Sequence, residues 1–81
     1  MRIRVLFFAQ ARERAGRASA ELTLPDGSGL DAALAQLRRE HPALESLWPH
    51  LAVAVDGRLA RGATALADGA ELALLPPVSG G

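Results

Sequence analysis

The sequence predicts a single α+β domain, in which a mixed sheet of four to five strands carries one main helix on one face. The two most hydrophobic strand-like segments lie at opposite ends of the chain, at residues 2–9 and 70–75. Between them lies one apolar stripe with helical spacing, and Gly-containing turn sequences separate the remaining short segments. A chain of 81 residues has room for one hydrophobic core, so no second domain is expected.

Residues 2–9 are typical of a central strand, because their second half is continuously apolar. Side chains alternate between the two faces of a strand, so every second residue from Ile3 to Phe7 lies on one face. Leu6 and Phe8 fall on the opposite face, after two arginines. This second face is either covered by loops or left open as a docking patch, and the pattern is compatible with both.

Residues 10–16 allow one or two helical turns that end at Gly16. Residues 18–24 alternate between small or apolar side chains and polar ones. This alternation predicts a half-buried strand, antiparallel to the first and near an edge of the sheet.

Residues 25–27, Pro-Asp-Gly, predict a turn, and Ser28 with Asp31 three residues later has the spacing of a capping box. The apolar stripe that follows consists of Leu30, Ala33, Leu34 and Leu37. The helix is expected to end by His41, because Pro42 disfavours a helical conformation in the residue before it.

The second half of the chain predicts further strands. Residues 43–51 are expected to form a loop or short turn, with Trp48 as a plug at the end of the core. The segments after it are a strand at 51–55, an Asp-Gly hairpin turn, a short strand at 58–60, a second turn at 67–69 and the final strand at 70–75.

The predicted order of elements is strand, strand, helix, strand, short strand, strand. Because the first and last strands are the most hydrophobic, we expect them to pair in parallel at the centre of the sheet. This is the β-grasp, or ubiquitin-like, architecture, in which the last strand directs the chain end into solvent. The sequence thus predicts a β-grasp domain at residues 1–75 and an extended reactive tail at residues 76–81.

The tail has the sequence Pro76-Pro77-Val78-Ser79-Gly80-Gly81. Its prolines stop the strand ladder and hold the exit extended, and six extended residues reach at most about 20 Å. The glycines carry no Cβ, so the site of another protein can close around them. We expect the carboxylate of Gly81 to be the catalytic group and the five residues before it to thread into a partner's site. The alternative is a frayed chain end.

The sequence before the tail shows no motif for catalysis, metal binding or phosphate binding. Nine basic residues balance nine acidic ones, which gives no reason to expect nucleic acid or a membrane as a partner. There is no cysteine, which fits a cytoplasmic location. His41 and His50 have neither the spacing nor the neighbouring ligands of a metal site. No Gly-x-Ser-x-Gly elbow or Gly-rich phosphate loop is present.

The carboxylate of Gly81 is ionised at neutral pH and is a nucleophile toward an activated phosphate. A partner enzyme with ATP could convert it to an acyl-adenylate, and a sulfur donor could then displace AMP to leave a thiocarboxylate. We therefore expect no cofactor bound by this chain, with ATP used by the activating enzyme.

Three motifs carry a family resemblance: Val5-Leu6-Phe7-Phe8-Ala9 followed by Arg12-Glu13 and Gly16, Asp68-Gly69 before an apolar strand, and the terminal Pro76-Pro77-Val78-Ser79-Gly80-Gly81. Together they resemble the molybdopterin synthase small subunit, the MoaD family of ubiquitin-like sulfur carriers. The resemblance implies that a MoeB-like, E1-type activating enzyme adenylates Gly81, which is then thiocarboxylated. The thiocarboxylate would donate sulfur to cyclic pyranopterin monophosphate inside a MoaE-like large subunit, forming molybdopterin.

The resemblance also implies a sulfurtransferase that is not catalytic alone and works in a heterotetramer of two small plus two large subunits. By position in the family, the surface that binds both partners falls on Phe8, Leu59 and Leu75, and the alternation of the first strand adds Leu6. Family members commonly carry aromatic residues where Leu74 and Leu75 stand, so the patch would be flatter here.

Two alternatives remain. A ThiS-like carrier would deliver sulfur for thiazole synthesis, although such chains are usually shorter and lack the Phe-Phe-Ala and Pro-Pro-Val features. A non-catalytic β-grasp interaction module would use only its folded surface.

Overall fold

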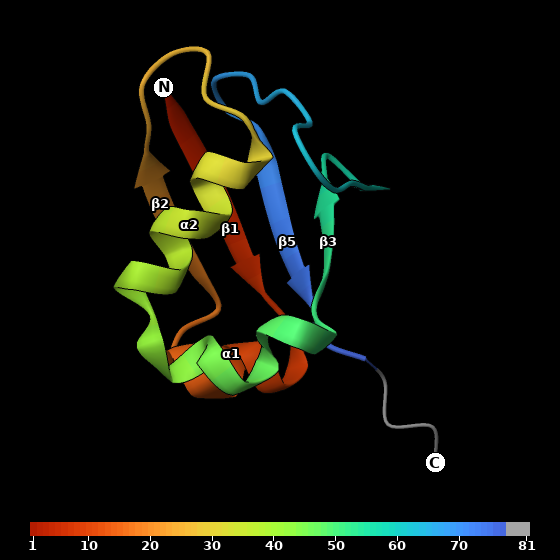
Figure 1. The fold of residues 1–81 in the computed structure, drawn as a ribbon. Coiled ribbons are helices and arrows are strands. Elements are labelled where there is room, and N and C mark those ends of the chain that lie inside the picture. The colour runs from red at the N-terminus through yellow and green to blue at the C-terminus, as the bar shows by residue number, and fades with distance from the viewer. Residues whose placement is uncertain (78–81) are drawn as a thin grey trace.

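The computed structural model describes residues 1–77 and contains a five-stranded sheet with the strand order β2-β1-β5-β3-β4 (Figure 1). The strands are β1 (Arg2–Phe7), β2 (Ser19–Thr23), β3 (Ala52–Val55), β4 (Arg58–Leu59) and β5 (Glu71–Leu75). β1 and β5 are parallel, and the other neighbouring strands are antiparallel. The predicted mixed sheet, with the first and last strands paired at its centre, is confirmed.

Helix α2 (Leu30–Glu40) crosses one face of the sheet, as expected for the main helix (Figure 1). It buries Leu30, Ala33 and Leu37, while Leu34 of the predicted stripe is half-buried. Helix α1 (Ala9–Ala15) and the 3-10 helix η1 (Pro42–His50) pack together at the end of the sheet where β1 and β5 end. The helical layer thus covers one face and one end of the sheet.

The prediction of a loop or short turn at residues 43–51 is wrong, because most of this segment belongs to the nine-residue 3-10 helix η1. Pro42 suits the first turn of a helix, where its missing N–H is not needed. The amide of Leu44 donates to the carbonyl of His41 at 3.0 Å, which is the i to i+3 hydrogen bond of a 3-10 helix. Leu44 and Leu47 are buried as a result, and Trp48 packs against the core from a half-buried position.

The predicted strand at residues 2–9 is two residues too long. β1 ends at Phe7, and Ala9 adopts a left-handed conformation with φ of 49°, which turns the chain into α1. The apolar run of residues 5–9 continues through this turn, so hydrophobicity does not show where the strand ends. The predicted helix end is confirmed, since Gly16 is left-handed with φ of 74°.

The predicted capping role of Ser28 is also wrong. Gly29 is the N-cap residue of α2 and makes no side-chain cap, while the Ser28 hydroxyl donates to the carbonyl of Pro25 at 2.7 Å. The first amide of the helix, that of Leu30, donates instead to the carbonyl of Thr64 at 2.8 Å. A loop distant in sequence therefore satisfies the orphan donor that a cap would otherwise take.

The hydrophobic core lies between the helices and the face of the sheet that they cover, which we call the inward face. The largest fully buried side chains are Phe7, Ile3, Leu22, Leu30, Leu37, Leu44, Leu72, Leu74 and Val5. Burying one such side chain stabilises the fold by roughly 1.5–3 kcal/mol. The centre of this core is formed by the two strands that the sequence marked as most hydrophobic.

The Asp-Gly hairpin between β3 and β4 is confirmed. Asp56 and Gly57 have φ of 49° and 83°, as a tight two-residue turn requires. The amide of Glu71 donates to the Asp56 carboxylate at 2.9 Å, and the Asp56 amide donates to the carbonyl of Glu71 at 2.8 Å. These two hydrogen bonds join the turn to the start of β5.

β5 ends at Leu75 and directs the chain away from the body of the molecule (Figure 1). Pro76 is half-buried and Pro77 is exposed. The remaining residues of the predicted tail, Val78, Ser79, Gly80 and Gly81, lie outside the described residues.

Candidate functional site

The outward face of the sheet, opposite α2, carries an apolar row that runs across four strands. In the strand register, Leu6 lies opposite Ala73, Ala73 lies opposite Ala54, and Ala54 lies opposite Leu59. Leu75 follows Ala73 on the same face because side chains alternate along β5. The row therefore crosses the middle of β5, and Leu75 extends it toward the end of the sheet where β5 leaves it.

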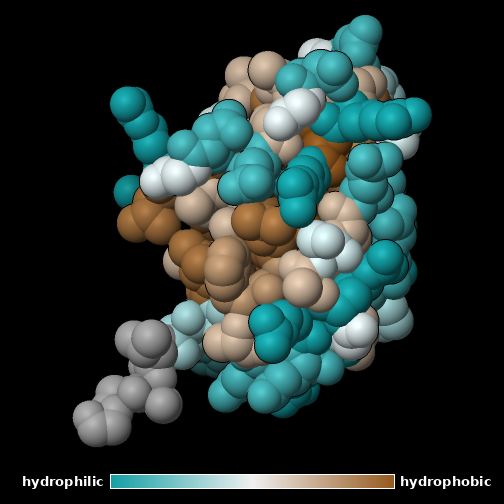
Figure 2. Space-filling view, turned by 180° about the vertical axis from the view of Figure 1, so that it is seen from behind, coloured by the Kyte–Doolittle hydropathy of each residue, from teal (hydrophilic) through white to brown (hydrophobic). Residues whose placement is uncertain are grey.

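The other end of the outward face is charged. Arg4 lies between Glu21 of β2 and Glu71 of β5, and Arg2 is 4.0 Å from the carboxylate of Glu21. Figure 2 shows this face, with hydrophobic surface gathered at its centre and hydrophilic surface around much of it. The same strands thus present a charged half near the start of β1 and an apolar half near its end.

All four residues predicted to bind partners lie on this side of the sheet. Leu59 and Phe8 are the large hydrophobic residues that are exposed among those described, with exposed fractions of 77% and 45%. Leu6 and Leu75 are half-buried. We call the surface formed by Leu6, Phe8, Leu59 and Leu75 the outward patch.

The structure adds small residues that were not predicted to bind partners. Ala73 and Ala54 lie between Leu6 and Leu59 in the register, and Ala52 lies opposite Leu75. Their small side chains make a shallow floor between the larger residues of the outward patch. Alternation along β3 and β5 was a signal for them, but the strand neighbours that join them to Leu6 were not visible in the sequence.

Phe8 is held in place by the junction between β1 and α1. Its backbone is extended, with φ of −114° and ψ of 151°, and its amide donates to the carbonyl of Leu74 at 3.4 Å. Its carbonyl accepts from the amide of Ala11 at 2.9 Å, at the start of α1. The left-handed turn at Ala9 then carries the chain away, which leaves the Phe8 ring at the surface.

Outside the outward patch, His41 and Arg38 pack against aromatic rings. The Phe7 and His41 rings make an edge-on contact with centroids 5.2 Å apart. Arg38 lies 5.5 Å from the centre of the Trp48 ring, and its hydrogen bond and ion pair with Glu45 raise the pKa of its guanidinium.

Within residues 1–77, no group of three or more His, Cys, Asp or Glu could hold a metal ion. No helix in this range has the length and hydropathy needed to cross a membrane.

Comparison with known proteins matches the chain over nearly its full length. The model of the ThiS family matches residues 5–81. A molybdopterin synthase sulfur carrier subunit from Chlamydomonas reinhardtii is 41% identical over 83 residues, covering 100% of this chain and 100% of that protein. Small archaeal modifier protein 1 from Haloferax volcanii is 39% identical over 82 residues, covering 91% of this chain and 94% of that protein.

Two solved structures have the same fold. The crystal structure of the Haloferax volcanii modifier superimposes with a TM-score of 0.90 at 36% identity, covering 100% of both chains. A complex of subunits 1 and 2 of molybdopterin-converting factor from Helicobacter pylori 26695 contains a chain that superimposes with a TM-score of 0.77 at 28% identity, again covering 100% of both. These matches confirm both the β-grasp fold and the resemblance to molybdopterin synthase small subunits, and the chain belongs to the ThiS family.

Proposed function

We propose that the chain is the sulfur-carrier small subunit of molybdopterin synthase. The observation that carries this proposal is the 41% identity, over both full chains, to a protein named as that subunit. The exposed outward patch beside the end of β5 supports it, because a carrier that cannot react alone needs a surface by which other proteins hold it.

In the proposed reaction, Gly81 supplies the reacting group. Its carboxylate oxygen attacks the α-phosphorus of ATP in a MoeB-like activating enzyme, and pyrophosphate leaves. A sulfur nucleophile then attacks the acyl carbon, so that a C–S bond forms and AMP departs, leaving the thiocarboxylate. The thiocarboxylate sulfur attacks a carbon of cyclic pyranopterin monophosphate, so that a C–S bond forms and the oxygen substituent of that carbon leaves. Water then hydrolyses the acyl–sulfur bond, which leaves the sulfur on the pterin and restores the carboxylate. Two such transfers supply the two sulfurs of the dithiolene. This chain contributes no side chain to these steps.

The tail and the patch have separate tasks in this proposal. Pro76 and Pro77 aim the chain end, and Val78, Ser79 and Gly80 pass through the partner's channel, where side chains larger than these would clash. The outward patch docks on a MoaE-like large subunit in an assembly of two small plus two large subunits. The Helicobacter pylori complex of subunits 1 and 2 supports a partner of this kind. The reaction would take place in the cytoplasm.

Deletion of Gly81 tests the proposal. The intact chain, incubated with the activating enzyme, ATP and a sulfur source, is expected to gain the mass of one oxygen-to-sulfur exchange at its C-terminus. The deletion variant should gain none and should support no molybdopterin formation with the large subunit. Arg39→Ala, an exposed change on α2, is the control and should react like the intact chain. Sulfur transfer that survives the deletion would contradict the carrier function.

Two other roles have specific support. The family name favours a ThiS-like carrier for thiazole synthesis, and 39% identity to an archaeal modifier favours attachment of Gly81 to other proteins. A thiazole carrier would pass its sulfur to a thiazole synthase rather than to the large subunit. A modifier would leave covalent conjugates with target proteins that are detectable by mass, whereas a non-catalytic module would give neither product.

A further inference from the structure

The sheet ends at β4, whose outer edge has backbone groups available for another strand. Val55 and Arg58 flank the two-residue turn, and the amide of Ala60 donates to the carbonyl of Val53 at 2.9 Å. Hydrogen-bonded pairs alternate with non-hydrogen-bonded pairs along an antiparallel ladder. Leu59 lies between Arg58 and Ala60, so it directs its N–H and C=O away from β3. An exposed edge of this kind is a template for strand addition.

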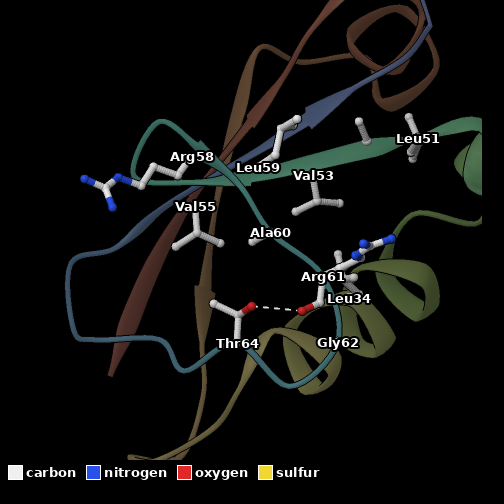
Figure 3. Close-up of a pocket in the computed structure, with 11 residues that line it drawn as sticks. Leu34, Leu51, Val53, Val55, Arg58, Leu59, Ala60, Arg61, Gly62 and Thr64 are labelled. Carbon is white, nitrogen blue, oxygen red and sulfur yellow. Dashed lines mark hydrogen bonds between the residues drawn. The ribbon is translucent and has the colours of Figure 1, made fainter.

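A groove of about 880 Å³ lies beside this edge, on the α2 side of the sheet (Figure 3). Val53 and Val55 of β3 point into it toward Leu34 and Thr64. Leu59 also lines the groove, but its side chain points toward the outward face of the sheet. Its apolar lining includes four half-buried side chains that pack against the core, namely Leu34, Leu51, Val55 and Ala60. The groove is therefore an extension of the core that the protein's own described residues leave partly uncovered.

The charge around the groove has one sign. Arg58 and Arg61 line it, and none of its lining residues is acidic. Neither arginine forms an ion pair with any residue in the range 1–77. The Thr64 hydroxyl is already used, because it donates to the carbonyl of Arg61 at 2.9 Å. An occupant with acidic groups on either side of an apolar centre would complement this lining.

We infer that the β4 edge is a docking site for an extended, acidic segment of a partner protein, independent of sulfur transfer. The segment adds to the sheet as a strand and pairs with the free backbone of Leu59. Alternate side chains enter the groove over Val53 and Val55, and acidic residues at both ends of the segment meet Arg58 and Arg61. This is strand addition, in which backbone hydrogen bonds give affinity and the groove gives specificity. A groove open along a strand edge suits an extended chain better than an enclosed small molecule.

The test is a titration of the full 81-residue, isotope-labelled chain with the capped peptide Asp-Val-Ile-Val-Asp, followed by NMR. Saturable shifts are expected at the amides of Leu59 and Ala60 and at the methyl groups of Val53 and Val55, with a dissociation constant below ~1 mM. The capped peptide Lys-Val-Ile-Val-Lys should bind at least about tenfold more weakly. Shifts that are absent, lie elsewhere or are equal for the two peptides overturn the proposal.

Charge-reversed variants sharpen the test. Arg58→Glu with Arg61→Glu should weaken binding of the acidic peptide at least about tenfold, and binding should also weaken as salt is added. The matched control is Arg17→Glu with Arg39→Glu, which makes the same change of charge at exposed positions outside the groove and should alter affinity less than about twofold. Equal losses in both variants overturn the site. The same amide shifts on concentrating the chain without peptide would make a second copy the occupant, and would also overturn it.

Discussion

The inward and outward faces of the sheet share the backbone of β1 and β5, yet only the inward face is covered by helices. On β5, Leu72 and Leu74 are fully buried on the inward face, while Ala73 and Leu75 on the outward face are half-buried. Residues one position apart therefore serve different purposes. The inward residues hold the fold together, and the outward ones leave apolar surface for another protein.

The comparison also separates the two halves of the outward face. Arg4 is exposed and lies opposite acidic residues on both neighbouring strands. Its guanidinium is therefore both solvated and next to opposite charges in the isolated chain. Leu6, two residues further along β1, lies opposite Ser19 and Ala73. A partner gains most by covering the apolar half, because burial of apolar surface drives association while the charged half is well solvated.

The largest expected effect is on the inward face. Leu72→Ala should lower the free energy of unfolding by about 3 kcal/mol, because Leu72 is fully buried between β1 and β3 and its truncation leaves a cavity. Leu75→Ala on the same strand is the matched control and should cost about 1 kcal/mol or less. Urea denaturation measures both. Similar losses for the two variants would mean that the faces are not distinguished as described.

The next effect is on binding. Phe8→Asp should weaken association with the large subunit by about 100-fold, since the new carboxylate loses water at the interface without gaining a partner. Its unfolding free energy should fall by less than about 1 kcal/mol, because the position stays wet in the isolated chain.

Thr23→Asp is the control for this binding experiment. Thr23 is exposed on the charged half of the outward face, opposite Arg2, so the variant should change affinity by less than about twofold. Calorimetry measures both affinities. A Phe8→Asp chain that loses folding and binding equally would place Phe8 in the core rather than in the outward patch.

The smallest effect concerns the two ends of α1, where the chain leaves the sheet. Ala9→Gly should raise the unfolding free energy by about 0.5 kcal/mol, because glycine adopts the φ of 49° at this position without strain. Gly16→Ala should lower it by about 1 kcal/mol, since Gly16 has φ of 74° and open space around it, so only the backbone conformation opposes a side chain. Thermal unfolding of both variants checks the sign. A loss of stability in Ala9→Gly would mean that the turn is not strained.

Periodicity predicted the elements better than their ends. The two central strands, α2 and the Asp-Gly hairpin follow from alternation, helical spacing and turn chemistry, all of which are local. The end of β1 does not, because Phe8 and Ala9 continue the apolar run that begins at Val5. Ser28 had the right spacing for a cap, but the carbonyl of Thr64, distant in sequence, took the helix amide instead.

The sequence predicted some parts of the candidate site and not others. Leu6, Phe8, Leu59 and Leu75 were predicted, three of them from a family resemblance rather than from any pattern that relates β4 to β1. The β4 edge and its groove were not predicted, because they depend on α2 and the segment from Ala60 to Thr64 meeting β3. No local pattern encodes the meeting of segments so far apart in the chain.

By itself, the sequence determined the α+β class, the parallel pairing of its two most hydrophobic strands and the order Pro76-Pro77-Val78-Ser79-Gly80-Gly81 at its end. These follow from side-chain hydrophobicity and backbone preference, which act over a few residues. Only the tertiary structure decided which apolar residues stay uncovered. Exposure depends on what packs against each side chain, and the strand order that places Leu6, Ala73, Ala54 and Leu59 in one row joins segments that are distant in the chain.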